Sequence, residues 1–227
     1  MDKKTAVSGK LSVSSLEIEP WCEYGPIDYL GEIVYYVLSG RGNLAYGTAA
    51  MYDWESDSYC YIAPRQRHSM LGQGETPLIV LKVEYDAEGP RSVKPWGVPI
   101  FKRDRPMRVD YIPGITSIVM QTPQSLEPMG AEHFGAIEYE IVQKAPRVDE
   151  PEASEPKPEK PTSETVNYVV RGRGKYLIDG KPYPVQAGSL VYSSGARVQL
   201  IDIDQWTLDF LFFWLKMYKD APYRGPL

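Results

Sequence analysis

The stretch EIVYYVLSGRG, at residues 32–42, is an apolar strand pattern that ends in Gly-Arg-Gly. A second stretch, ETVNYVVRGRG at residues 164–174, begins 132 residues later and is identical to the first at seven of eleven positions. Glycine at both ends of Gly-Arg-Gly permits positive φ, which a tight hairpin needs. The repeat predicts that one structural unit occurs twice in the chain.

The sequence that follows each copy is also similar in the two halves. Further short strands are predicted at 43–46, 59–64 and 78–83, and again at 175–181, 188–192 and 208–215. Asp179-Gly180 is a hairpin signal. Short strands at regular spacing, separated by turn residues, are typical of a β-sandwich or barrel. We therefore predict an all-β chain with little helix and two barrels in tandem.

Composition supports β structure and excludes several classes of partner. The chain has 227 residues, of which 17 are Tyr, 19 Gly and 20 Pro, and this favours strands joined by many turns. A net charge of −5 argues against nucleic acid, since phosphate binding needs a basic surface. No apolar stretch approaches the roughly 18 residues of a membrane span. Only two histidines are present, which excludes a zinc site of three histidines.

The two cysteines and the N-terminus indicate a cytoplasmic protein. Cys22 and Cys60 do not suggest a disulfide framework. The charged residues at 1–4 are not followed by the apolar run of a signal peptide.

Two domains are expected, at 1–113 and 114–227, and the first includes a joining segment at 86–113 that is rich in Pro, Arg and Lys. The second domain contains the segment 145–164, where five prolines and six acidic residues occur among 20. Such a composition cannot form a packed core, so we expect an exposed, mobile loop there.

These repeated motifs resemble the cupin family, and their duplication resembles a bicupin, which has two tandem cupin domains. The stretches at 32–42 and 164–174 are similar to the end of the first cupin motif, an acidic residue followed by I-Y-Y-V-L-E-G-E-G. The second motif, typically G-D-x-V-Y-I-P-P-G-T-P-H, is similar to 56–68, with a counterpart at 188–199. The resemblance implies two jelly-roll barrels, each able to hold one small ligand.

The metal-binding pattern of the family is only partly present. Cupins hold a metal with two histidines and a glutamate from the first motif and a histidine from the second. In the first barrel these positions fall near Ile27 and Tyr29, on Ile33, and on His68. In the second barrel the glutamate position falls on Thr165. A one-residue gap leaves open whether Val198 or Gln199 takes the histidine position and faces the interior. Degenerate sites of this kind disfavour a divalent metal, and no cofactor is expected.

The manganese-dependent ureidoglycine aminohydrolases, a bicupin subfamily, use Glu, His, His and Gln in the second barrel. Glu159 and Gln199 fall on their Glu and Gln positions, whereas Pro161 and Thr165 fall on the two histidines. Because carboxylate and amide oxygens alone do not replace two imidazoles, this resemblance implies ancestry rather than activity.

The residue expected to act as an acid or base is His68, whose unperturbed pKa lies near neutrality. The alternative is a relic histidine that makes one hydrogen bond. Arg65 and Arg67 can bind a carboxylate or phosphate, or simply face solvent. Tyrosine in a small barrel offers apolar area and a hydroxyl, so it suits a small organic ligand or plain core packing. The predicted ligand-binding residues are Arg65, Arg67, Tyr35, Tyr36, Tyr61, Glu32 and Gln199.

Three functions remain open. The first is a bicupin that binds a small organic molecule in its N-terminal barrel, either as a metal-independent isomerase or lyase or as a binding protein. The second is a metal-dependent enzyme, an aminohydrolase or dioxygenase, whose substituted ligands near His68 would come from Cys22, Cys60, Asp28 and Glu32. The third is a structural or assembly protein. A homodimer is the expected oligomer.

Overall fold

The computed structural model describes residues 3–6, 10–46, 50–86, 100–102, 107–112, 115–121, 126, 131, 133–143, 163–194, 198–203 and 207–216. The chain divides into two compact units, Met1–Pro106 with Gln124–Ala131, and Met107–Pro123 with Glu132–Leu227. Residues 145–162 of the predicted loop lie outside the described residues, and its last two residues belong to a strand. No helix among the described residues is long and apolar enough to cross a membrane.

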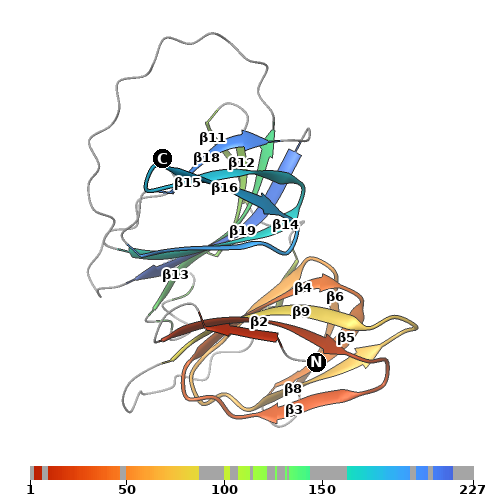
Figure 1. The fold of residues 1–227 in the computed structure, drawn as a ribbon. Coiled ribbons are helices and arrows are strands. Elements are labelled where there is room, and N and C mark those ends of the chain that lie inside the picture. The colour runs from red at the N-terminus through yellow and green to blue at the C-terminus, as the bar shows by residue number, and fades with distance from the viewer. Residues whose placement is uncertain are drawn as a thin grey trace. The chain divides into compact units, whose positions relative to one another are not determined.

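The first unit contains two antiparallel sheets (Figure 1). Sheet A has the strand order β1-β2-β9-β4-β7-β10. Its strands are β1 Lys3–Ala6, β2 Leu11–Ile18, β9 Leu78–Tyr85, β4 Glu32–Ser39, β7 Ser58–Ile62 and β10 Ile100–Lys102. Sheet B has the order β3-β8-β5-β6. Its strands are β3 Glu23–Ile27, β8 His68–Gln73, β5 Arg41–Tyr46 and β6 Ala50–Glu55.

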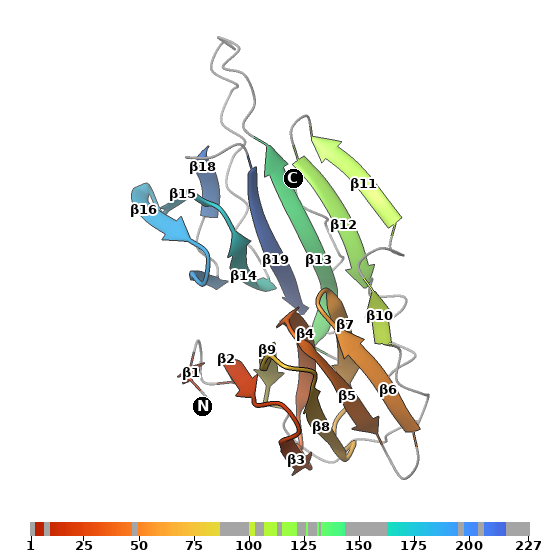
Figure 2. The same cartoon turned by 90° about the vertical axis from the view of Figure 1, so that its right-hand side faces the viewer.

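The second unit also contains two sheets, and Figure 2 shows β11, β12, β13 and β19 side by side in the larger one. Sheet C has the order β11-β12-β13-β19-β14-β17. Its strands are β11 Met107–Ile112, β12 Ile115–Gln121, β13 Phe134–Gln143, β19 Thr207–Lys216, β14 Ser163–Arg171 and β17 Leu190–Ser194. Sheet D has the order β16-β15-β18, with β16 Lys181–Gln186, β15 Arg173–Ile178 and β18 Val198–Ile203.

The strand orders confirm the repeat. The run β2-β9-β4-β7 of sheet A corresponds to β13-β19-β14-β17 of sheet C, and β8-β5-β6 corresponds to β18-β15-β16. The all-β fold with two jelly-roll units is therefore as predicted. The predicted joining segment contributes a strand to each unit, because β10 pairs with β7 and β11 pairs with β12.

The Gly-Arg-Gly stretches are corners between sheets, and the expectation of tight hairpins was wrong. Strand β4 belongs to sheet A, whereas β5 belongs to sheet B. Only the first glycine of each copy has positive φ, 87° at Gly40 and 98° at Gly172. A Cβ at Gly40 would lie 2.3 Å from the carbonyl oxygen of Pro77, and one at Gly172 would lie 2.6 Å from that of Thr207. These corners therefore need glycine both for the backbone angle and for close approach to the last strand.

The predicted hairpin at Asp179-Gly180 is confirmed. Ile178 pairs with Lys181, and the two residues between them have φ of 47° and 80°. Positive φ at both central residues is typical of a type I′ turn, whose twist matches that of the flanking strands.

The core of the first unit lies between sheets A and B. Alternate residues of β4 enter it, namely Ile33, Tyr35 and Val37, because successive side chains of a strand point to opposite faces. Sheet B contributes Leu44, Trp54 and Met70. This alternation decides which of the predicted site residues face the interior.

Candidate polar site in the first barrel

Two rows of residues cross the inner face of sheet A. The strand registers place the first row as Ser14, Lys82, Tyr35 and Cys60, and the second as Ser12, Glu84, Ile33 and Ile62. Directly paired residues of an antiparallel ladder share a face of the sheet. Because Tyr35, Cys60, Ile33 and Ile62 belong to the core, the serines and both charged residues face the interior as well.

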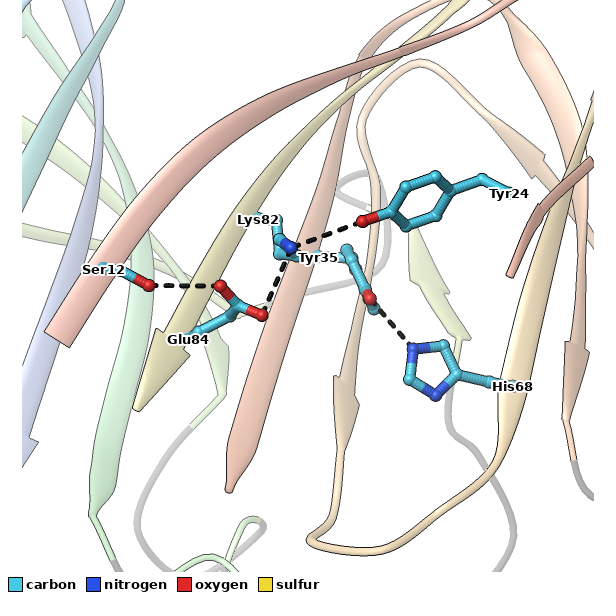
Figure 3. Close-up of polar contacts among 6 residues, drawn as sticks. All are labelled: Ser12, Tyr24, Tyr35, His68, Lys82 and Glu84. Carbon is cyan, nitrogen blue, oxygen red and sulfur yellow. Dashed lines mark hydrogen bonds and ion pairs between the residues drawn. The ribbon is translucent and has the colours of Figure 1, made fainter. Parts of the chain in front are cut away.

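The charged residues form an ion pair on β9. Lys82 Nζ lies 3.2 Å from Glu84 Oε1, and their side chains are only 7% and 8% exposed. Ser12 Oγ donates a hydrogen bond to Glu84 Oε2 at 3.1 Å. Figure 3 shows Lys82 between Glu84 and Tyr24, whose hydroxyl is 3.5 Å from Nζ. Taking two charges out of water costs several kcal/mol per ion, and their attraction offsets this only when the geometry is good.

The second polar feature is a hydrogen bond between Tyr35 of sheet A and His68 of sheet B (Figure 3). His68 is buried, with Nδ1 2.8 Å from the carbonyl oxygen of Gln66 and Nε2 2.9 Å from the hydroxyl of Tyr35. A carbonyl only accepts, so Nδ1 carries the proton. Burial lowers the pKa of His68. The hydrogen bond to Gln66 opposes this effect, and the positive charge of nearby Lys82 lowers the pKa further. The imidazole is therefore neutral near pH 7, and Nε2 accepts from Tyr35.

This arrangement can move a proton. The Tyr35 hydroxyl and His68 Nε2 are already aligned as donor and acceptor, which is the geometry that acid–base catalysis needs. Lys82 stands directly opposite Tyr35 in the β4–β9 ladder. The neutral histidine, the phenol and the ion pair thus lie on facing sheets of one barrel interior.

The structure brings together two of the predicted site residues, Tyr35 and His68, and separates three others. Glu32, Tyr36 and Tyr61 are out of phase with Ile33 and Tyr35, so they lie on the opposite face of sheet A. The Tyr36 hydroxyl donates to Asp57 Oδ1 at 2.5 Å on that side. Alternation predicts two faces of a strand but not which of them is inside, so these three residues do not share the interior with Tyr35, and their binding of a ligand stays a prediction.

The two predicted arginines lie in the connection between β7 and β8. Arg65 and Arg67 are both exposed, and the Arg65 backbone N–H donates to the carbonyl oxygen of Tyr29 at 2.7 Å. Their binding of an anion stays a prediction.

In the second barrel the register answers which residue corresponds to His68. His68 pairs with Tyr46 on β5, and Val198 pairs with Ile178 at the matching place on β15. Gln199 pairs instead with Leu177, one position out of phase, and its side chain lies outside the described residues. The predicted Gln199 position is therefore not the counterpart of His68.

The residues around His68 do not fit a divalent metal. Ile27 pairs with His68, and Ile33 and Tyr29 complete the positions that hold metal in cupins. Burial first, and then Glu84 and Asp86, raise the pKa of the Tyr29 hydroxyl. One imidazole whose two nitrogens are already hydrogen-bonded and one protonated phenol are a poor donor set. Within the described part of the chain, no three His, Cys, Asp or Glu residues are grouped so that they could hold a metal.

The cysteines named for a substituted metal site are both free, and only one is inside. Cys60 is buried and Cys22 is exposed. Burial raises the pKa of the Cys60 thiol, so this sulfur is a neutral core group near pH 7.

Five residues of this polar site were not predicted from the sequence, namely Lys82, Glu84, Ser12, Ser14 and Tyr24. Lys82 and Glu84 interrupt the apolar strand 78–85 two residues apart, which places both on one face. That spacing was a usable signal, since charged residues are rarely buried unless they are paired.

Solved structures resemble nearly the whole chain, whereas no protein-family model and no curated protein matches it. The putative glyoxylate-induced protein of Pseudomonas aeruginosa is 11% identical with a TM-score of 0.73, and the match covers 100% of this chain and 82% of that one. A deletion mutant of Bacillus subtilis oxalate decarboxylase is 12% identical with a TM-score of 0.73, over 95% and 72% of the two chains. Hazelnut vicilin is 11% identical with a TM-score of 0.67, over 91% and 75%.

These likenesses define the class of fold. The chain has the cupin fold, and its two jelly-roll units are the two halves expected from the repeat. At these identities the comparison shows the fold alone, since one fold hosts many functions.

Proposed function

We propose that this two-barrel cupin-fold protein binds a small organic molecule in the interior of its first barrel. The observation that carries the proposal is the ion pair Lys82–Glu84 beside the Tyr35–His68 hydrogen bond. Well-packed apolar residues in place of a buried ion pair are often neutral or stabilising for a fold. The presence of such an ion pair inside a small barrel is therefore better explained by a role in ligand binding than by a contribution to stability.

The cupin metal positions of the first barrel are degenerate. The polar groups that are present there favour a function that needs no metal. His68 and Tyr35 form a proton donor–acceptor pair, so the enzymatic form of the proposal is a metal-independent isomerase or lyase with His68 as the catalytic base. The alternative form is a binding protein that performs no chemistry. We further expect the protein to be a homodimer, and sedimentation equilibrium would test this by measuring the mass of the oligomer in solution.

The test is a thermal-shift screen of small organic molecules against the parent protein and Tyr35→Phe. A ligand that binds the folded protein raises the apparent melting temperature by mass action. We expect a hit whose shift is reduced in Tyr35→Phe and retained in Tyr183→Phe, the matched change at an exposed tyrosine of the second barrel. Equal shifts in both variants would remove the first barrel as the binding site.

Metal analysis of the purified protein tests the competing function. Stoichiometric Mn, Fe, Ni or Zn bound to the parent would contradict a metal-independent site and favour the metal-dependent alternative.

A further inference from the structure

We infer that the ligand of the first barrel is an uncharged small molecule whose oxygen atoms accept hydrogen bonds from Ser14 and Trp54. This inference rests on the proposed function and names the chemical class of the ligand. It combines the charge balance of the barrel interior with two buried polar groups that have no partner among the described residues.

The charged groups that the structure describes in this interior form a neutral pair. Lys82 and Glu84 neutralise each other at 3.2 Å, and the hydrogen bonds of His68 are those of a neutral imidazole. Among the described residues Lys82 is the one buried cation of this interior, and Glu84 already pairs with it. A carboxylate or phosphate ligand would therefore add a buried negative charge beside no further cation of the described part, and an ammonium ligand would add a positive one. Since burying an unpaired charge is strongly unfavourable, the balance favours an uncharged ligand.

The unmet hydrogen-bonding groups are neutral. Ser14 Oγ and Trp54 Nε1 are each on residues only 2% exposed, and neither has a hydrogen-bond partner within the described part of the chain. Buried polar atoms are nearly always paired, so each such atom needs an explanation. An indole N–H can only donate and a serine hydroxyl can donate, so the interior lacks an acceptor such as a hydroxyl or carbonyl oxygen.

Trp54 lies next to Tyr35, and Ser14 lies in the same row of the inner face as Tyr35, on the far side of Lys82. The rings of Trp54 and Tyr35 have centroids 5.9 Å apart. Ser14 belongs to the same inner-face row as Tyr35, with Lys82 between them. A molecule that accepts hydrogen bonds from both donors would therefore extend along this row, across Lys82 and Tyr35, from sheet A to sheet B.

The competing explanation is ordered water, which commonly satisfies buried polar groups. Water and ligand differ in what mutation does. If only water binds to Ser14 and Trp54, removal of either donor leaves the affinity for an added molecule unchanged.

The experiment is titration calorimetry with matched pairs of molecules that differ in charge. The probes are D-xylose against D-xylonate, D-glucose against D-gluconate, and lactamide against lactate. In the parent protein we expect the uncharged member of at least one pair to bind about tenfold tighter or more. Ser14→Ala and Trp54→Phe should each weaken that binding about three- to tenfold through the lost hydrogen bond. Ser194→Ala, at an exposed serine of the second barrel, is the matched control.

A charge-changing variant gives the sharper test. Glu84→Gln leaves Lys82 without its counter-charge, so the preference within each pair should shift about tenfold or more toward the carboxylate. Tighter binding of the carboxylates by the parent protein would overturn the inference and leave the proposed function standing. Uncharged binding that Ser14→Ala and Trp54→Phe leave unchanged would also overturn it. If no member of any pair binds, both the inference and the proposed function fail.

Discussion

The two barrels share a backbone plan but differ in the residues that stand at corresponding register positions. In the first barrel the row reads Ser14, Lys82, Tyr35 and Cys60, and in the second the same register reads Glu138, Phe212, Asn167 and Val191. The next rows are Ser12, Glu84, Ile33 and Ile62 against Ala136, Trp214, Thr165 and Ser193. Aromatic residues therefore occupy both positions of the ion pair in the second barrel.

This difference between the two barrels indicates that the fold does not require the ion pair. The second barrel forms the same strand order around an apolar cluster that includes Tyr176 and Phe210, whose ring centroids are 6.4 Å apart. The position of His68 is taken there by Val198. Lys82, Glu84 and His68 thus have no counterpart of the same kind in the second barrel, and this supports a role for them in the first barrel alone.

The largest expected effect comes from breaking the ion pair. Lys82→Met should reduce the free energy of unfolding by about 3–5 kcal/mol, because Glu84 is then buried without its counter-charge. The double variant Lys82→Met/Glu84→Leu should recover most of this loss, because apolar residues often replace a buried ion pair without loss of stability. Urea denaturation measures both, with Lys175→Met at an exposed site as control. A loss below about 1 kcal/mol for Lys82→Met would show that the pair is hydrated.

The corner glycines Gly40 and Gly172 are a feature that the two barrels share, and substitution of each should have a similar effect on stability. Gly40→Ala and Gly172→Ala should each cost about 2–4 kcal/mol, from the left-handed backbone and the clash with a carbonyl oxygen. Gly180→Ala has positive φ but open space around its Cβ, so it should cost only about 1 kcal/mol. Chemical denaturation of the three variants checks this order. Equal losses in all three would mean that the close approach contributes nothing.

A smaller effect is expected for the tyrosine that reaches across the sheets. Tyr35→Phe leaves the buried His68 Nε2 without its donor, so the free energy of unfolding should fall by about 1–3 kcal/mol. Tyr183→Phe, at a residue that is 46% exposed in the second barrel, should change it by less than about 0.5 kcal/mol. The prediction is contradicted if the two losses are the same.

The smallest effect is a pH dependence that belongs to the first barrel. Burial lowers the pKa of His68 below its ordinary 6.5, so the unfolded chain binds the proton more readily than the folded one. Stability should therefore fall as pH drops below about 6.5, with a slope of at most about 1.4 kcal/mol per pH unit from this group. Denaturation curves between pH 5 and 8 should lose this component in His68→Gln and keep it in His133→Gln. Identical curves for the two variants would rule out His68 as the source.

Much of the fold could be predicted because it depends on local patterns. The repeat located β4 and β14, the glycines located the ends of these strands, and Asp179-Gly180 located the hairpin. The error at Gly-Arg-Gly has a physical reason: a tight turn and a corner between sheets both need positive φ. Only the pairing of β5 with β6 and β8 distinguishes them.

The site was harder to predict because it depends on which strands face one another. His68 and Tyr35 were identified as candidates, but their hydrogen bond joins residues 33 positions apart on different sheets. The faces of Tyr36 and Tyr61 could not be predicted, because the sequence shows alternation without its phase. Lys82 and Glu84 carried a sequence signal, whereas the contact of Lys82 with Tyr24 is visible only once sheets A and B are packed together.

The division of the chain has a consequence for separating the barrels. The first unit takes Met1–Pro106 and also Gln124–Ala131, a segment that begins only after β11 and β12 of the second unit. Leu126 and Ala131 in that segment are buried, and the Ala131 N–H donates to the Leu126 carbonyl oxygen at 3.2 Å. No single cut therefore yields two complete halves: cleavage after Lys102 would take this buried segment from the first barrel, and cleavage at 113 would also detach β11 from β12. The repeat in the sequence therefore does not mark a position at which the chain could be divided into two complete barrels.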